Sequence, residues 1–190
     1  MRLFTAVVPT PEAIDHLRGV LPEKAPTGVR WSEPETWHVT LGFHGEVPAG
    51  ALEDLTGGLA AAAAEVEPFA IHLTGAGTFS GRSVWIGLGG ETRGLQALVS
   101  GVRSAARAVG LPDDARLRAR HHLTVARATR PGGATVAADL VRALAVYRGP
   151  EWEVTRIALV ESHLGEGRSG GPRHVEVADL PLGPGDAVAG

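Results

Sequence analysis

Cysteine is absent from this chain of 190 residues. Disulfide bonds, thiolate nucleophiles and cysteine-based zinc sites are therefore excluded. Aromatic residues make up only 5% of the sequence, and Lys24 is the single lysine among 18 basic residues. We interpret this preference for arginine, together with the many alanines and glycines, as a mark of a GC-rich genome rather than of function.

A strong charge of either sign is also missing, because the formal net charge is only −3. Such a balance argues against a protein that coats long stretches of nucleic acid. A small phosphate-bearing ligand, or the end of one RNA strand, is compatible with it.

Long hydrophobic runs are lacking as well. No apolar stretch approaches the length of a membrane span, and residues 1–8 are too short an apolar stretch for a signal peptide. We therefore expect a cytoplasmic protein with no membrane partner, and expect it to be a monomer. The length allows one compact domain or two small, intimately packed lobes, and the 44% hydrophobic content is ample for a buried core. We expect a single bilobal domain over 1–181, in which interleaved lobes each give one His-x-Thr strand, followed by a flexible tail at 182–190.

The most informative feature present is a repeated His-x-Thr pattern. It occurs at His38-Val39-Thr40, His72-Leu73-Thr74 and His122-Leu123-Thr124, whereas a random chain of this composition would contain about 0.5 copies. Each copy lies in a segment where apolar and polar residues alternate, which is typical of a strand with one buried face. Residues two apart share a face of a strand, so each copy offers one imidazole beside one hydroxyl. In the first segment the residues expected to turn toward the core are Trp37, Val39, Leu41 and Phe43.

Periodicity along the chain predicts helices and strands in a repeated order. Helices are expected at 11–21, 49–66, 92–109 and 135–147. Further strands are expected at 2–8, 69–79, 84–88, 117–127, 152–161 and 174–177, with a hairpin turn at 80–82. Both halves then run helix, His-x-Thr strand, helix, strand, strand. This order pairs His38 with His122 and leaves His72 unmatched, so we expect His72 to be a solvent-facing strand histidine.

The paired histidines indicate acid and base chemistry on a phosphoester. Histidine titrates near neutral pH, so one imidazole can donate a proton while the other accepts one. Thr40 and Thr124 would donate hydrogen bonds to phosphate oxygens. Arg127 would add a permanent charge, but it lies three residues after Thr124, so this role requires a bulge or strand end near Ala126.

Each of these residues also has a purely structural interpretation. A single strand histidine is more often structural than catalytic, and strand threonines are common because of their β-propensity. The occurrence of the pattern in matching topological positions favours the catalytic interpretation. A metal site is the weakest alternative, because no carboxylate accompanies the histidines at ligand spacing, and we expect no metal or other cofactor.

The chain resembles the 2H phosphoesterases, and most of all the RNA 2′,3′-cyclic phosphodiesterases, historically called 2′-5′ RNA ligases. The resemblance extends from Arg2-Leu3-Phe4, through both His-x-Thr motifs and the stretch 81–87, to 170–173. It implies an α+β fold with pseudo-twofold symmetry: a bilobal, duplicated fold with two mainly antiparallel sheets facing a central cleft and helices on the outside. It also implies metal-independent hydrolysis of an RNA 2′,3′-cyclic phosphate, or of a small cyclic nucleotide, to a 2′-phosphomonoester.

The resemblance further assigns roles to residues. His38 matches the proton donor to the leaving 3′-oxygen, His122 matches the proton acceptor from water, and Arg127 matches a basic position that often follows the second motif. Two alternatives stay open. One is 2′-5′ RNA ligation by the reverse reaction, and the other is a non-catalytic module that binds a nucleotide or phosphate.

Overall fold

The computed structural model describes residues 1–112, 121–130 and 132–184 of the chain. The α-helices among these residues are α1 Pro11–Val20, α2 Leu52–Ala64, α3 Thr92–Ala108 and α4 Gly133–Leu144, and the short 3₁₀ turns are η1 Pro34–Thr36, η2 Ala49–Ala51 and η4 Arg168–Gly170. The strands are β1 Arg2–Val7, β2 Val29–Trp31, β3 Val39–Glu46, β4 Phe69–Phe79, β5 Ser83–Gly90, β6 His122–Ala128, β7 Arg148–Val154, β8 Arg156–His163 and β9 Arg173–Pro181. The expected strand at 117–127 therefore begins at His122, and 117–120 lie outside the described residues. None of the helices in the described ranges is both long and apolar enough to cross a membrane.

The strands form one strongly curled antiparallel sheet with two arms. Its order is β7-β4-β5-β6-β3-β1-β8-β9, and β2 pairs separately with β6. The arm β7-β4-β5-β6 and the arm β3-β1-β8-β9 meet at the pair Val39–Leu123. The two expected sheets are thus joined edge to edge, and the α+β class is confirmed.

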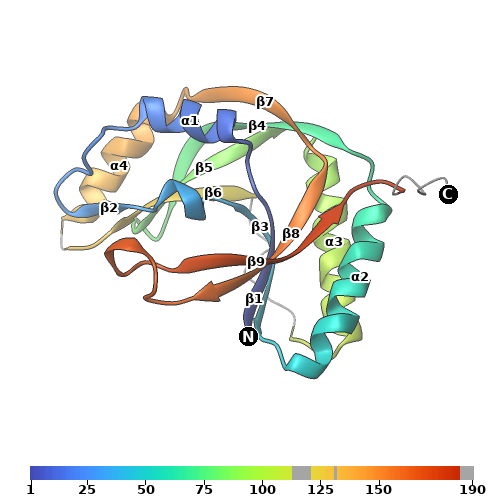
Figure 1. Cartoon of the computed structure of the whole chain (residues 1–190). Coiled ribbons are helices and arrows are strands. Elements are labelled where there is room, and N and C mark those ends of the chain that lie inside the picture. The colour runs from blue at the N-terminus through green and yellow to red at the C-terminus, as the bar shows by residue number, and fades with distance from the viewer. Residues whose placement is uncertain (113–120, 131, 185–190) are drawn as a thin grey trace.

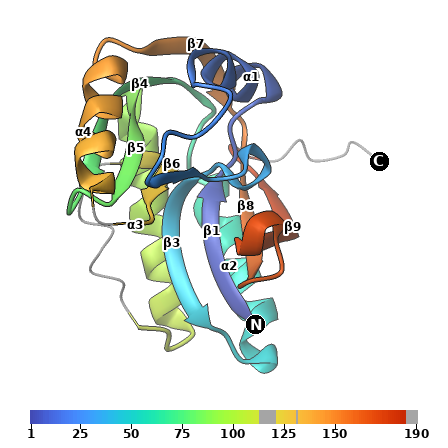
Figure 2. The same cartoon turned by 90° about the vertical axis from the view of Figure 1, so that its left-hand side faces the viewer.

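Helices cover the outside of both arms. Helices α2 and α3 pack together over the arm that contains β3, while α4 packs on β4, β5 and β6 and α1 packs on β7 (Figures 1 and 2). This leaves the other face of the curled sheet for a site between the arms.

Local sequence accounts for the ends of several elements. The side chain of Thr10 accepts a hydrogen bond from the backbone N–H of Ala13 and caps α1. Helix α3 ends before Gly110, whose φ of 76° is readily adopted by glycine. The expected hairpin is formed by β4 and β5, and its central residues Ser80 and Gly81 have φ values of 52° and 64°, as in a type I′ turn.

Two bulges occupy matching positions in the strands that carry the motifs. In β3, Thr40 pairs with Ala6 and Gly42 pairs with Thr5, so Leu41 is the extra residue. In β6 the extra residue is likewise the one after the motif threonine, because the register with β5 shifts at Val125. A bulge reverses which face the following residues point to.

The bulge at Leu41 explains one wrong prediction. Phe43, expected in the core, is 45% exposed, and His44 is buried instead, at 3% exposed. Strict alternation from Val39 onward gives the opposite assignment, because nothing in the local sequence marks the inserted residue.

The predicted strand at 152–161 is also wrong, because it is two strands. β7 pairs with β4 in one arm, and β8 pairs with β1 in the other, so the chain crosses between the arms at Thr155. The backbone N–H of Leu182, the first residue of the expected tail, donates to the carbonyl of Thr155, and its side chain is 7% exposed. Residues 185–190 lie outside the described residues.

Candidate active site

His38 stands immediately before β3 and is held by the turn that precedes it. Its Nδ1 donates a hydrogen bond to the carbonyl oxygen of Thr36 at 2.7 Å, while the neighbouring Trp37 is buried, at 3% exposed. A carbonyl only accepts hydrogen bonds, so Nδ1 carries the hydrogen and Nε2 is the nitrogen left for a reactant.

His122 is the first residue of β6, the strand that adjoins β3. Its ring packs edge-on against Phe79, with a centroid distance of 4.7 Å, and lies 6.1 Å from Trp85. Around the pair Val39–Leu123 the strands run antiparallel. His38 therefore lies toward Thr124 and Thr40 toward His122, which brings the two motifs together as the sequence predicts.

The electrostatic environment holds His38 in its neutral form. Burial lowers the pKa of His38 to about 4; the hydrogen bond to Thr36 opposes this shift, and the neighbouring His174 and His122 add to it. An unliganded protein at neutral pH therefore carries an uncharged imidazole at position 38.

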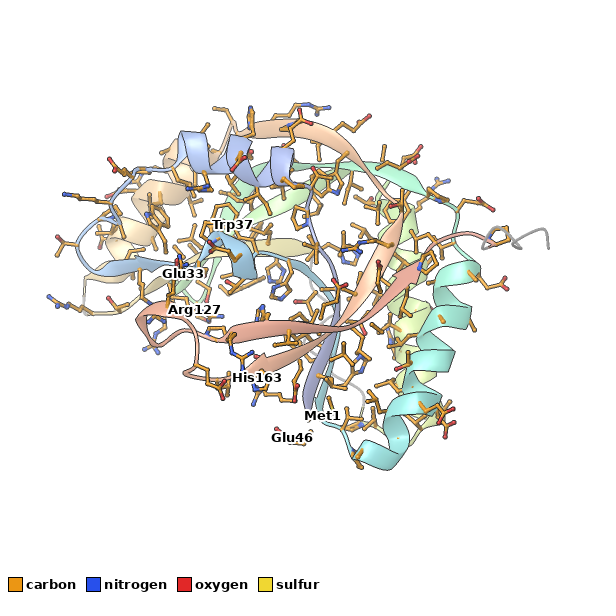
Figure 3. The ribbon with its side chains drawn as sticks, in the orientation of Figure 1. Met1, Glu33, Trp37, Glu46, Arg127 and His163 are labelled. Atoms are coloured by element: carbon orange, nitrogen blue, oxygen red, sulfur yellow. The ribbon has the colours of Figure 1, made fainter. Side chains whose placement is uncertain are left out.

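The two motif threonines and Arg127 line the same face of the sheet. Thr40 and Thr124 are half-buried, on the side opposite the buried Val39 and Leu123. The bulge at Val125 returns Arg127 to this face, as the sequence analysis requires, and Arg127 is exposed, with Nη1 donating to Oγ of Ser83 at 3.3 Å. Figure 3 labels Arg127 at the end of the molecule where β2 lies.

His174 is a residue that the sequence analysis did not select. It lies in β9, and its ring is 5.3 Å from that of His38 and 5.0 Å from that of Phe4. His174 belongs to no His-x-Thr copy, and β9 and β3 are far apart in sequence, so no local periodicity reports this contact.

The prediction for His72 is half wrong. His72 takes no part in the ring contacts of His38 and His122, but it is buried, at 5% exposed, rather than solvent-facing. Its ring lies against Gly89 on the neighbouring strand, where a Cβ would be 2.6 Å from His72 Nε2. The missing side chain at Gly89 leaves the space that the imidazole fills.

No group of three or more histidine, aspartate or glutamate side chains within the described ranges is arranged to hold a metal ion. The site consists instead of two imidazoles with one hydroxyl beside each, and of Arg127 at its edge. Such a set is suited to moving protons and to binding an anion.

The sequence pattern of the 2′-5′ RNA ligase superfamily matches residues 6–166 of this chain, which include both motifs. The chain belongs to the 2′-5′ RNA ligase superfamily. The resemblance to the 2H phosphoesterases is thereby confirmed.

Two relatives with assigned functions are similar to this superfamily member. The RNA 2′,3′-cyclic phosphodiesterase of Archaeoglobus fulgidus is 34% identical over 169 residues, which cover 86% of this chain and 92% of that protein. The RNA 2′,3′-cyclic phosphodiesterase of Geobacillus stearothermophilus is 31% identical over 160 residues, which cover 80% of this chain. The matched region is 47% of the Geobacillus protein, so the chain spans about half of that relative.

Solved structures share the fold of this superfamily member over nearly its whole length. A crystal structure of a Thermus thermophilus protein has a TM-score of 0.75 and 26% identity, and covers 98% of this chain and 100% of its own. The crystal structure of E. coli LigT complexed with 3′-AMP has a TM-score of 0.71 and 25% identity, and covers 95% and 97% of the two chains.

Proposed function

We propose that this protein hydrolyses the 2′,3′-cyclic phosphodiester at the end of an RNA strand, or of a small cyclic nucleotide, to a 2′-phosphomonoester. One observation carries the proposal: His38 and His122 head two adjacent antiparallel strands on one face of the sheet, each with a threonine two residues later. The names of the relatives from Archaeoglobus and Geobacillus support it.

Two proton transfers accompany the reaction. As water attacks phosphorus and the new P–O bond forms, His122 accepts the proton that the water loses. As the bond from phosphorus to the 3′-oxygen breaks, His38 donates a proton to that oxygen. Each positioned transfer contributes about 10²–10⁴-fold to the rate, and the two histidines suffice without a metal or other cofactor.

The low pKa of His38 in the unliganded protein places a condition on this mechanism. A general acid must hold a proton when the substrate is bound. The cyclic phosphodiester carries one negative charge, and an anion beside a buried imidazole favours the protonated form. We therefore propose that the substrate itself brings His38 into its acidic form.

The remaining residues act on the phosphate. The hydroxyls of Thr40 and Thr124 donate hydrogen bonds to the non-bridging oxygens, whose negative charge grows during the attack. Arg127 supplies a permanent cation at the edge of the site. Its exposure and its single weak hydrogen bond to Ser83 leave its guanidinium with donors for a phosphate.

The test is to offer 2′,3′-cyclic mononucleotides and short oligonucleotides and to identify the product by chromatography and ³¹P NMR. We expect a 2′-phosphomonoester, at a rate unchanged by a chelator. A 3′-phosphate product would contradict the role of His38, and activity that disappears with chelator would contradict the metal-free reaction. A cyclic nucleotide that binds tightly and is recovered unchanged would identify a binding module instead.

The reverse reaction is a second candidate, which the superfamily description itself favours. The same acid and base would join a 2′,3′-cyclic end to a 5′-hydroxyl and form a 2′-5′ linkage. Adding an excess of a 5′-hydroxyl oligonucleotide separates the two directions, because ligation yields a longer RNA and hydrolysis does not.

A further inference from the structure

His174 packs directly on the proposed proton donor. Its ring meets the His38 ring at an interplanar angle of 73°, and the two rings share Phe4 as a common neighbour. His174 pairs with Ser162 across β8 and β9, and it is half-buried. It therefore belongs to the same wall of the site as His38.

Within the described part of the chain, the ring nitrogens of His174 have no hydrogen-bond partner. His174 is close enough to His38 to lower the pKa of that residue. By contrast, Nδ1 of His38 is committed to Thr36. An imidazole beside the reactive group with both nitrogens unpaired is available to bind a ligand oxygen.

The two arms differ in the side chain that follows each motif threonine by three residues, and this difference suggests a role for the unpaired His174 ring. The bulges at Leu41 and Val125 place Phe43 and Arg127 at equivalent positions, each three residues after the motif threonine and each exposed. One arm therefore presents a cation at this position, while the other presents a benzyl ring. The strand that His38 precedes therefore lacks, at this position, the cation that β6 carries.

We propose that His174 is a phosphate-binding residue of this site, and that it supplies a positive charge beside His38 in addition to the charge that Arg127 supplies from β6. The inference rests on the proposed function only in taking a phosphate as the ligand. Unlike arginine, histidine is charged only when protonated. The affinity of the site for an anion should therefore increase as the pH falls.

Burial lowers the pKa of His174, and a bound anion opposes this shift because it favours the protonated ring. Other titratable and charged groups also lie near His174. His38 faces it from the start of β3, with His122 beyond on β6. From β1 its ring contacts the uncharged Phe4, and Arg2 is the charged residue of that strand. The other titratable and charged residues of the two strands that carry or flank it are Arg156, Glu161, His163, Arg173, Glu176 and Asp179. His163 and Glu161 contact each other, and Arg173 contacts Glu166, while Glu176 lies 3.5 Å from Arg156.

Sulfate is a suitable probe, because it keeps its double charge between pH 5 and 8 and needs no turnover. We compare its affinity for the wild type and for His174→Gln at pH 5.5 and pH 8. At pH 5.5 the variant should bind sulfate about tenfold more weakly, as expected for loss of a charged hydrogen bond. At pH 8 the two proteins should differ little. His16→Gln is the matched control, because His16 lies on α1 and contacts Tyr147 instead, and it should bind sulfate like the wild type.

Equal sulfate affinity of the wild type and folded His174→Gln at pH 5.5 would overturn the proposal. If the variant does not fold, the ring ¹⁵N signals of His174 in the wild type decide: sulfate should raise its protonation midpoint, and an unchanged midpoint rejects the role. With a 2′,3′-cyclic nucleotide, His174→Gln should raise KM at pH 5.5 more than it lowers kcat. A protein that binds sulfate through His174 but turns over no cyclic phosphate would refute the proposed function and leave this inference standing.

Discussion

The His38 and His122 imidazoles are partly exposed side chains on a face that no helix covers, so their removal should affect the chemistry more than the fold. His38→Ala and His122→Ala should each lower kcat on a 2′,3′-cyclic nucleotide by about 10²–10⁴-fold. The melting temperature of each variant should stay close to that of the wild type.

His72 provides the matched control, because it belongs to the third His-x-Thr copy and lies in β4, outside the ring contacts of the site. His72→Gln should retain turnover in the folded fraction, although burial of His72 makes some loss of stability expected. A folded, inactive His72→Gln together with an active His38→Ala would show that the pairing of the motifs is wrong.

His44 makes a separate prediction about stability and pH. It is buried, its Nε2 lies 2.7 Å from Oγ1 of Thr5, and burial lowers its pKa to about 4. The unfolded chain, with a histidine pKa near 6.5, therefore binds more protons than the native state between these two values. The native state should lose stability as the pH falls from about 6.5 to 4, and His44 should account for roughly 2–3 kcal/mol of that loss.

Urea unfolding at pH 7 and pH 4.5 measures this loss. In His44→Gln the difference in unfolding free energy between the two pH values should shrink by the share of His44. His38, also with a pKa lowered to about 4, keeps part of the dependence in the variant. An undiminished difference in His44→Gln would mean that His44 is not held neutral in the native protein.

At the level of single side chains, the sequence predicts some positions in the site well and others not at all. The pairing of His38 with His122 follows from element order alone and agrees with the pairing of β3 with β6. The burial of His44 depends on one inserted residue, and the place of His174 depends on the docking of a strand from the far end of the chain. Neither leaves a periodic signal.

Between elements, the contact of β3 with α3 depends on a missing side chain. A Cβ at Gly42 would lie 2.6 Å from Cγ1 of Val102, whose β-branched side chain is 1% exposed and has little rotameric freedom in a helix. Gly42→Ala should therefore destabilise the protein by about 1–3 kcal/mol through overpacking.

A double-mutant cycle in chemical denaturation tests this contact. Gly42→Ala should cost less in a Val102→Ala background, because the shortened side chain makes room for the new methyl group. Gly57→Ala is the control with the opposite sign. Gly57 has open space around it in the middle of α2, so alanine there should stabilise by about 0.5–1 kcal/mol. Strict additivity of the Gly42 and Val102 changes would contradict the proposed clash.

The boundaries of helices and strands are likewise predictable where a local sequence signal marks them, and not where long-range pairing sets them. Helix α3 and the β4–β5 hairpin have local signals, namely a 3.6-residue apolar stripe and a type I′ turn, and both form where they are expected. The break between β7 and β8 falls at Thr155, a residue type that gives no local signal for the end of a strand, as glycine or proline would. The break forms because the first part of this extended segment pairs with β4 in one arm and the second part pairs with β1 in the other. This pairing is set by the assembled sheet and not by the local sequence.

Over the whole chain, the two arms have equivalent strand orders and carry equivalent bulges, but they share little sequence. The duplication is therefore visible in the order of elements and in the spacing of the motifs. Arg127 and Phe43 stand at equivalent positions after these bulges, so the two arms differ in side-chain chemistry where their strand register is alike.

The low net charge of −3 predicts that the protein contacts few phosphates of an RNA substrate, and hence that its activity depends only weakly on salt. A protein that holds only the terminal phosphate and one neighbour displaces few counterions, and each contacted phosphate of a single strand contributes about −0.7 to the slope of log affinity against log salt. For a 20-nucleotide substrate, kcat/KM should therefore fall with salt with a slope of about −1 to −2. The same slope should hold for a substrate of three or four nucleotides. A 2′,3′-cyclic mononucleotide measured over the same range reports the salt effect on the site itself. A slope steeper than about −3 for the long substrate alone would reveal contacts along the strand that the charge balance does not predict.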